Sequence, residues 1–354
     1  MTQPSPTAAS AAPTSSAATG SAPTSADVAR LAGVSRATVS YVLNDTVGGR
    51  VSEQTRLRVR AAADELGYVP HAAARSLRAG HSGLVLLATP EITFGPLFNE
   101  FFTELRAGLR DHGYTAVLYG NRSDLGERDI ARAWAELRPT AVLAGAGDEL
   151  TPEGVEILKR SGTRAVLTLG ARPIPGAHAL VLDQREIGVS AGTHLLAGGH
   201  EAIGVLMPTD RTLLPFTEPR LAGVRAAAAA SVNPGRVRVE PLPLDYTEEA
   251  AAALAARWRS LGLTALYGYN DEYAALVLAA FQDAGIAVPA EAAVVGSDDT
   301  MLARVLRPRL TSVQVALPTG QVLADLIDRL IREPDSPVET HQLGSSRIVP
   351  RDSG

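Results

Sequence analysis

Between Leu84 and Arg332 the chain alternates short apolar runs with longer amphipathic segments, and this alternation limits the possible folds more than any other feature of the sequence. Short apolar runs between turn signals indicate buried strands, and longer segments with helical periodicity indicate helices. The runs predicted as strands are Leu84–Thr89, Ala116–Tyr119, Ala141–Ala144, Ala165–Leu169, Ala179–Leu182, Ala202–Met207, Val237–Glu240, Ala265–Tyr269, Ala293–Gly296 and Ser312–Val315.

The segments predicted as helices lie between these strands. They are Asn99–His112, Glu127–Leu137, Glu153–Arg160, Ile187–Ala197, Arg220–Ala230, Thr247–Leu261, Asp271–Ala284 and Gly320–Arg332. Strands that alternate with helices form parallel sheets covered on both faces, so we predict an α/β fold. About ten strands fit two parallel sheets better than one. A ligand would then bind at the carboxyl ends of the strands, in the crevice between the sheets.

Ahead of this region, residues 24–44 predict two short helices joined by a tight turn. Thr24 is placed to cap the first helix, with Asp27 as its capping-box partner. Gly33 suits a left-handed turn, and Ser35 is placed to cap the second helix. This pattern is typical of a helix-turn-helix, whose second helix reads bases in the DNA major groove. An ordinary helical hairpin with a solvated face remains the alternative.

A third helix, Glu53–Leu66, is predicted between a cap at Ser52 and a stop at Gly67. Helical periodicity assigns apolar side chains of the three helices to one small core. The predicted core residues are Val28, Leu31, Ala32, Val39, Val42, Leu43, Leu57, Val59, Ala62, Ala63 and Leu66. The second helix is then free to turn Arg36, Ala37, Ser40 and Tyr41 outward.

Two segments of weaker structural propensity flank this headpiece. Residues 1–23 consist almost entirely of Ser, Thr, Ala, Pro and Gly, so we expect a disordered tail. Pro70 forbids continuation of the preceding helix, and residues 71–80 can form a helix of only about two turns, which is marginal in water. Either this segment is a plain linker, or it is a hinge helix that orders in the DNA minor groove with Leu77 wedged between base steps.

Charge is distributed unevenly along the chain. The formal charge is −5, yet residues 1–80 hold eight Arg and five acidic residues, which leaves −8 for the remainder. A basic head on an acidic body is typical of a DNA reader with a separate sensor, because only the contacting face must attract phosphate. The absence of Cys excludes disulfides and thiolate sites. Since no export signal or spanning segment is recognisable, we expect a cytoplasmic, nucleoid-associated protein without membrane contact.

Stretches throughout the chain resemble the lactose repressor/galactose repressor (LacI/GalR) family of bacterial transcription regulators. From Thr24 to about Arg351 they are DVARLAGVSRATVSYVLN, VSEQTRLRVRAAADELGYVPHAAARSLR, DQREIGVSAGTHLLAGGHEAIGVLMP, RLAGVRAA, YNDEYAALVLAAFQDAGIAVP, VVGSDDT and LTSVQ. The resemblance implies a repressor that binds a palindromic operator as a homodimer. It also implies a two-lobed, periplasmic-binding-protein-like sensor, which holds a small effector, a sugar in most relatives, between its lobes.

The same resemblance implies domain boundaries. The headpiece would span 24–70, the hinge helix 71–80 and the sensor 83–354. The first lobe of the sensor would comprise about 83–182 and 311–337, and the second about 183–310 and 338–354, with three crossovers between the lobes.

Arg36 and Ala37 match the two family positions that choose base pairs. Arg can donate two hydrogen bonds to guanine, whereas Ala offers only a methyl contact. Tyr41 stands where the family usually has Arg, so the operator should differ at that step. Leu77 matches the wedge residue of the hinge. The predicted DNA contacts are Thr24, Ser35, Arg36, Ala37, Thr38, Ser40, Tyr41, Asn44, Arg50, Ser52, Ala74, Arg75 and Leu77.

Arg220, Asn270 and Asp298 match polar effector contacts of the family. Arg220 could clamp a hydroxyl pair or a carboxylate bidentately. Asn270 and Asp298 directly follow predicted strands, where the α/β pattern also places a ligand. Phe94 and Tyr246 lie in loops and either stack on a sugar ring or pack in the core. We expect no cofactor, metal ion or catalytic residue.

Two other functions are compatible with an α/β body. An enzyme would carry a reaction motif, but the sequence contains no GxxxxGK[ST] and no HExxH. Asp298 and Asp299 could bind a metal ion, yet nothing near them in the sequence completes a ligand set. A sugar-binding protein without a regulatory DNA role would need an export signal, and the headpiece stands in its place.

Overall fold

The computed structural model describes residues 22–43, 51–69, 82–89, 96–120, 126–145, 150–170 and 173–354. The chain divides into two units, Met1–Gly80 and His81–Gly354, each with its own core. Several residues predicted to bind DNA or effector lie outside the described residues, namely Asn44, Arg50, Ala74, Arg75, Leu77 and Phe94. Most of the tail and the predicted hinge 71–80 also lie outside them.

The first unit contains three helices whose ends follow local capping chemistry. They are α1 (Ser25–Ala32), α2 (Arg36–Leu43) and α3 (Glu53–Leu66). The capping box at Thr24 is confirmed, because the Thr24 backbone N donates to Asp27 Oδ2 at 3.0 Å and the Thr24 side chain accepts from the Asp27 N. Gly33 ends α1 with a φ of 65°, a left-handed conformation that favours glycine. These local signals fix where the headpiece turns.

The headpiece core differs from the predicted one at two leucines. The buried residues are Val28, Ala29, Ala32, Val39, Val42, Val59, Ala62 and Ala63. Leu31 is 47% exposed and Leu57 is 60% exposed, so their assignment to the core was wrong. Leu57 precedes Val59 by two positions, about 200° around the helix, and therefore points away from the core side. In α1 the buried residues are Val28, Ala29 and Ala32, so the core side includes Ala29 and not Leu31.

The second unit begins with a six-stranded sheet in the order β11–β5–β4–β3–β1–β2. Its strands are β1 (Leu84–Thr89), β2 (Thr115–Gly120), β3 (Ala141–Ala144), β4 (Ala165–Gly170), β5 (His178–Val181) and β11 (Thr340–Gln342). All pairings are parallel. Its helices are α5 (Pro96–Asp111), α6 (Glu127–Glu136), α7 (Pro152–Arg160) and α13 (Gly320–Arg332). One face packs on α5 and α13, and the other on α6 and α7.

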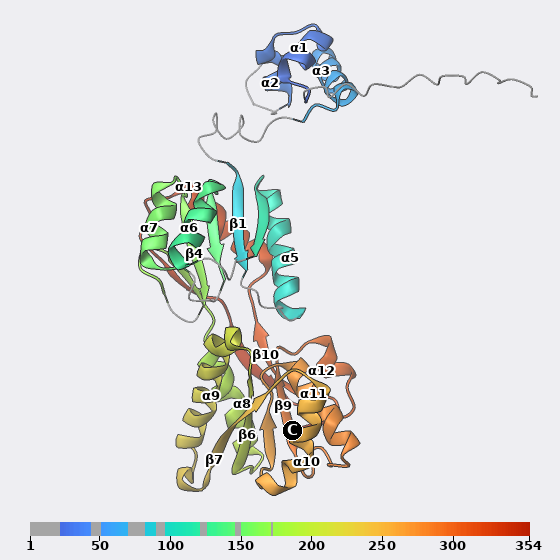
Figure 1. Ribbon diagram of the computed structural model, residues 1–354, viewed down its shortest axis with the longest axis vertical. Helices are drawn as coiled ribbons and strands as arrows, with labels where there is room; N and C mark the ends of the chain where they lie inside the picture. Colours follow the sequence, from blue (N-terminus) through green and yellow to red (C-terminus); the bar gives the residue numbers. More distant parts are fainter. Residues whose placement is uncertain are drawn as a thin grey trace, which may run out of the picture. The chain divides into compact units, whose positions relative to one another are not determined.

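A second six-stranded sheet follows in the order β12–β10–β9–β8–β6–β7. Its strands are β6 (Ala202–Pro208), β7 (Arg238–Leu244), β8 (Ala265–Tyr267), β9 (Ala293–Ser297), β10 (Thr311–Ala316) and β12 (Ser345–Val349). Only β12 runs antiparallel to its neighbour. The helices are α8 (Gln184–Ala197), α9 (Leu214–Ala229), α10 (Glu248–Leu261), α11 (Asp271–Asp283) and α12 (Met301–Val305). α8 and α9 cover one face, and α10 and α11 the other (Figure 1).

The chain passes between the two sheets three times, after β5, after β10 and after β11. The predicted lobe boundaries were wrong at two strands. Residues 311–316 form β10, which pairs with β9 and so belongs to the second sheet rather than the first. Residues 340–342 form β11, which pairs with β5 in the first sheet rather than the second. The second and third crossings therefore lie at the carboxyl ends of these strands.

Candidate functional site

The outward face of α2 carries the side chains that were predicted to read DNA. Arg36, Ala37 and Tyr41 are exposed, and Tyr41 is 48% exposed. Val39 and Val42, each 1% exposed, hold the opposite side of the helix in the headpiece core. The structure therefore anchors α2 on one side and presents its first turn to solvent, as insertion in a groove requires.

Three of the residues predicted to contact DNA cap the N-termini of helices. Thr24, Ser35 and Ser52 precede α1, α2 and α3. Ser35 Oγ accepts from the Thr38 N at 3.1 Å and Ser52 Oγ accepts from the Thr55 N at 3.3 Å. Their first role is thus to satisfy helical N–H groups. A phosphate contact would add to that role, because the N–H groups of the first turn also attract anions.

Arg220 is the central polar residue of the second unit. It lies on α9 and is 5% exposed. Its Nε donates to Gln184 Oε1 at 2.8 Å, and its Nη1 donates to the backbone oxygen of Tyr269. The guanidinium also lies 4.9 Å from the centre of the Tyr269 ring. Because a guanidinium has five N–H donors, these bonds orient it without using all of its donors.

Asp298 lies near this cation at the carboxyl end of β9. It is half-buried, and its φ of 94° is left-handed. Burial raises the pKa of Asp298, while the positive charge of Arg220 opposes the rise. Within residues 173–354, all of which are described, no ion pair joins the two groups directly. Arg220 and Asp298 thus interact electrostatically without a direct ion pair.

Asn270 and a row of aromatic rings border the same edge of the sheet. Asn270 caps α11, where its Oδ1 accepts from the Tyr273 N at 3.0 Å, and its side chain also bonds the Glu272 carboxylate, which opposes the rise in the pKa of Glu272. The Tyr273 ring lies 5.9 Å from that of Tyr269 and 4.8 Å from that of Tyr246. Tyr246 is 57% exposed. Its exposure contradicts the alternative that it simply packs in the core.

Sequence reasoning missed two polar residues beside Arg220. Gln184 is 4% exposed and orients the guanidinium from the start of α8. Thr217 is 1% exposed, and its Oγ1 has no hydrogen-bond partner among the described residues. Thr217 precedes Arg220 by three positions and so lies on the same side of α9. That spacing could have identified Thr217, but the role of Gln184 depends on the packing of α8 against α9.

Asp271 links the segments that form this edge of the sheet through buried hydrogen bonds. It has no exposed surface. Its carboxylate accepts from Ser312 Oγ at 2.6 Å, from the Thr300 N at 2.7 Å and from Thr300 Oγ1 at 3.0 Å. These bonds join the start of α11 to β10 and to the loop that carries Asp298. Burial, the largest effect, raises the pKa of Asp271 to about 7.

Asp271 should therefore make the stability of the protein depend on pH. Its folded-state pKa of about 7 lies above the ordinary 3.8, so its contribution is lost as the pH rises towards and through 7. Between pH 5 and pH 8, Asp271 should lower the free energy of unfolding by on the order of 2–3 kcal/mol. Urea unfolding of Asp271→Asn should lack this decline. Asp283→Asn, an exposed change on the same helix, should retain it; identical profiles for wild type and Asp271→Asn would contradict the expectation.

The described parts of the chain show no metal site, no membrane-spanning helix and no nucleophile elbow. No group of three His, Cys, Asp or Glu residues there could hold a metal ion. None of the described helices is long and apolar enough to cross a membrane. The stretch Gly188–Gly192 spells GxSxG, which escaped the sequence reasoning, but it lies inside α8. A nucleophile elbow needs a sharp turn from strand to helix, so this serine is not one; Ser190 Oγ instead lies 3.1 Å from Ser346 Oγ.

Both units resemble known families and proteins. Residues 24–71 match the lacI family of bacterial regulatory proteins, and residues 193–354 match the periplasmic binding protein-like domain. The HTH-type transcriptional repressor PurR of Photobacterium profundum is 31% identical over 298 residues, which cover 81% of this chain and 85% of that protein. The chain belongs to the LacI family. The HTH-type transcriptional regulator GalR of Escherichia coli (strain K12) is 32% identical over 302 residues, which cover 83% of this chain and 84% of that protein.

Solved structures show the same fold. The Lac repressor dimer bound to operator and the anti-inducer ONPF has a TM-score of 0.74 and 23% identity, over 94% of this chain and 99% of that chain. The complex of the transcriptional regulator CelR with cellobiose has a TM-score of 0.63 and 25% identity, over 94% of this chain and 100% of that chain. The predicted fold class is confirmed. The LacI-family chain is a DNA-binding transcriptional repressor with a ligand-binding domain, not an enzyme.

Proposed function

We propose that this LacI-family protein works at the nucleoid as a homodimer on a near-palindromic operator, and that a sugar-like effector bound beside Arg220 alters its operator affinity. The observation that carries the proposal is the buried, oriented guanidinium of Arg220 near Asp298, at the carboxyl edge of the second sheet. Ligands of open parallel sheets bind at that edge. The CelR complex contains cellobiose, which is consistent with a sugar site in this fold.

The charges of this region favour a ligand with neutral hydroxyl groups. A hydroxyl both donates and accepts, so adjacent hydroxyls can accept from Arg220 and donate to Asp298. A carboxylate ligand would meet the acidic side chains of Asp298 and Glu272. Burial and the nearby Asp298 raise the pKa of Glu272. Thr217 offers a further unpaired hydroxyl, and the exposed ring of Tyr246 is suited to stack on a sugar ring.

A few apolar side chains remain exposed on the second unit. Met301 and Val305 are one turn apart on α12 and are 69% and 58% exposed. On the first sheet, Leu118 of the edge strand β2 is 48% exposed. Scattered exposed apolar side chains are normal on a monomer, so the homodimer is supported mainly by the Lac repressor neighbour, which is a dimer on its operator.

Operator binding can be tested by selecting duplexes from a random pool with the full chain. The expected product is an enriched near-palindrome that binds two chains, since the symmetry of the site mirrors that of the dimer. A measurement of complex mass on the selected duplex gives the stoichiometry. Recovery of no enriched sequence would contradict operator recognition, and an enriched site that binds a single chain would contradict the homodimer.

Arg36→Ala should lower affinity for the selected operator because it removes an exposed base reader from α2. One good bidentate contact discriminates by about 1–3 kcal/mol, so the loss should be roughly 5-fold to 150-fold for each half-site. The preference should relax at one base pair of each half-site. Arg58→Ala, an exposed arginine of α3, is the matched control. If Arg36→Ala leaves the base preference intact, the reading role belongs to another residue.

A further inference from the structure

The amino ends of the strands in the first sheet form an edge that is rich in arginine. β1 pairs with β3, and β3 pairs with β4, all in parallel and in level register. The segments that lead into these strands therefore share one edge. Arg138 precedes β3 and Arg164 directly precedes β4. The helices α6 and α7 lead back to the same edge; Arg160 is the last residue of α7, and Arg132 lies about one turn before the end of α6.

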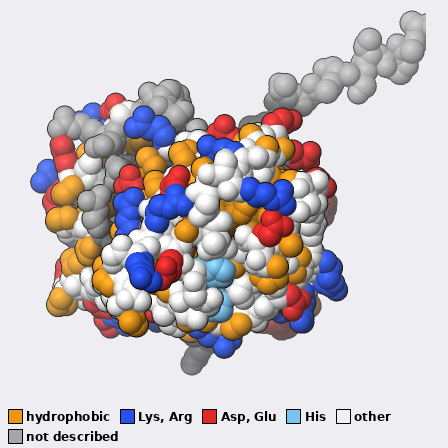
Figure 2. Space-filling model, turned by 90° about the horizontal axis from the view of Figure 1, so that it is seen from below, with side chains coloured by type: hydrophobic (Ala, Val, Ile, Leu, Met, Phe, Trp, Pro, Cys, Tyr) orange, Lys and Arg blue, Asp and Glu red, His pale blue; other side chains and the backbone are white. Residues whose placement is uncertain are grey.

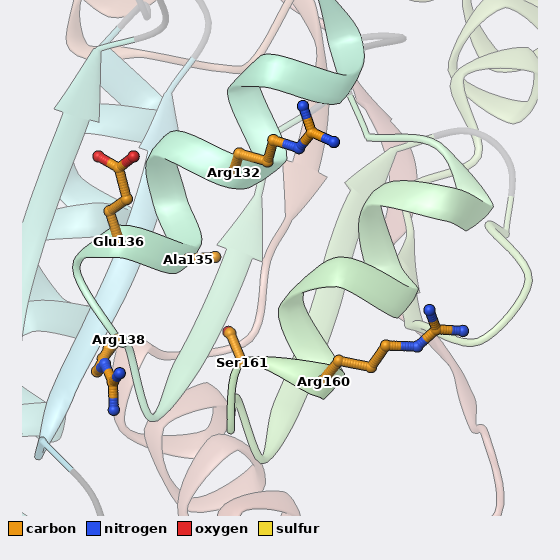
Figure 3. Close-up of a pocket in the computed structure, with 6 residues that line it drawn as sticks. All are labelled: Arg132, Ala135, Glu136, Arg138, Arg160 and Ser161. Atoms are coloured by element: carbon orange, nitrogen blue, oxygen red, sulfur yellow. The ribbon is translucent and has the colours of Figure 1, made fainter.

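A hollow of about 710 Å³ lies between these helix ends, and three arginines line it against one acid. Its lining is Arg132, Ala135, Glu136, Arg138, Arg160 and Ser161 (Figure 3). Figure 3 shows the Arg132 and Arg160 side chains extending to the same side and Arg138 lying apart from them, so the three guanidinium groups do not converge on one point. A compact anion would need donors that converge on it. Divergent cations suit an extended polyanion, whose charges are spread along its length.

Little in the described residues neutralises these cations. The Arg138 backbone N donates to Ala135 O at 2.9 Å, but its side chain has no hydrogen bond or ion pair to another described residue. Arg132 and Arg160 have only long ion pairs, 3.6 Å to Asp129 and 3.7 Å to Glu156, between largely exposed side chains. Exposed pairs of this kind contribute about 0–1 kcal/mol. The guanidinium groups thus remain available to an external partner at little cost.

This same edge receives the chain from the headpiece. The Gly83 N donates to Thr140 Oγ1 at 2.9 Å, and Ser82 Oγ lies 3.3 Å from the same hydroxyl. Thr140 follows Arg138 by two residues. Only residues 70–81 separate Val69 of the headpiece from Ser82. Twelve residues span at most roughly 45 Å even when fully extended, so the chain that leaves the headpiece enters the second unit at this edge through a connection of limited length.

The charge of the rest of this unit makes the edge unusual. Residues 81–354 contain 25 Lys and Arg against 33 Asp and Glu. Positive and negative side chains are interspersed on the face of the molecule shown in Figure 2. A unit with a net charge of −8 is repelled by DNA, and a local excess of arginine where the chain enters from the headpiece would offset that repulsion.

We propose that the arginine edge, defined as Arg132, Arg138 and Arg160, contacts the phosphate backbone of the DNA that the headpiece holds. The proposal rests on operator binding by the headpiece. Phosphate contacts position a protein without reading sequence. The edge therefore adds affinity on every DNA sequence and leaves the preference for the operator unchanged.

The test compares Arg138→Gln/Arg160→Gln with Arg236→Gln/Arg257→Gln, a matched pair of exposed arginines in the other lobe. Affinity of the full chain is measured on the selected operator and on a random duplex of about 30 base pairs, from about 50 to 200 mM salt. Removal of one phosphate contact should reduce the slope of log K against log salt by ~0.9, so the double variant should reduce it by ~2 units for each chain. The reduction should be equal on both duplexes and absent in the control.

A slope that matches wild type in the Arg138/Arg160 variant overturns the proposal and leaves the edge to an acidic protein partner. A reduced slope on the operator alone also overturns it, because the contact would then depend on sequence. Failure of the underlying function looks different: wild type would then bind operator and random duplex equally, whatever the variant does.

Discussion

Replacing Arg220 with Ala should weaken effector binding by about 2–5 kcal/mol, roughly 30-fold to several thousandfold, which is the cost of truncating one member of a buried, hydrogen-bonded charged set. The guanidinium is 5% exposed and is oriented by Gln184 and by the backbone oxygen of Tyr269. Its removal would leave both acceptors unpaired and would deprive Asp298 of the positive charge that opposes the rise in its pKa. A ligand hydroxyl would also lose its donor.

The measurement begins with a thermal-shift screen of monosaccharides, disaccharides and nucleosides against the wild-type protein. Calorimetric titration of the strongest hit into Arg220→Ala then gives the loss of affinity. Arg225→Ala, an exposed change on the next turn of α9, should bind like wild type. Arg220→Lys retains the charge but cannot make both oriented bonds, so its affinity should fall between the two. Wild-type affinity in a folded Arg220→Ala protein would place the effector elsewhere.

Local chemistry determined most of what the sequence predicted correctly. Helix starts at Thr24, Ser35 and Ser52 follow from hydroxyls that accept helical N–H groups, and these groups act within three residues of themselves. The ten predicted strands all exist. The apolar runs of the inner strands are buried between helices on both sides of a sheet, whereas the edge strands β2 and β7 are partly exposed. Such signals need no knowledge of distant parts of the chain.

The elements that were missed lack such a local signal. β11 consists of Thr340, His341 and Gln342, a polar sequence that becomes a strand because it extends the sheet beside β5. α12 has only five residues, with an exposed Met301 at its start. Partner strands and neighbouring helices decide these elements, so periodicity within the segment cannot predict them. The lobe boundary at β10 was misplaced for the same reason, because the partner strand β9 decides to which sheet β10 belongs.

The residues of the candidate site also divide into those that the sequence predicted and those that it could not. Arg220, Asn270 and Asp298 were placed from the family resemblance, and the latter two also from their positions after strands. Gln184 was missed because it reaches Arg220 only through the packing of α8 on α9, 36 residues apart in the chain. Contacts that join distant segments require the tertiary structure. The packing of these two helices is therefore part of the site.

That packing depends on glycines at which the backbones of α8 and α9 meet. A Cβ at Gly188 would lie 2.0 Å from the backbone oxygen of Arg220, and one at Gly223 would lie 2.1 Å from that of Arg185. Contacts under 3 Å with backbone atoms cannot be relieved by a side-chain rotation. The helices must separate instead, and Arg220 lies on the turn that would move.

Gly188→Ala and Gly223→Ala should each lower the free energy of unfolding by about 3 kcal/mol or more, at or beyond the usual range for overpacking, because backbone must shift. Helix propensity alone predicts the opposite sign, a gain of about 0.8–1 kcal/mol for Gly to Ala inside a helix. Urea unfolding therefore separates the two effects by sign. The change that Gly192→Ala makes in the free energy of unfolding should lie between the overpacking loss and the propensity gain, since its Cβ would first meet the Ala227 side chain at 3.0 Å. Gly235→Ala meets nothing within 4 Å and should change stability by less than about 0.5 kcal/mol. A stabilised Gly188→Ala protein would show that α8 and α9 tolerate separation and that Arg220 is not held by their contact.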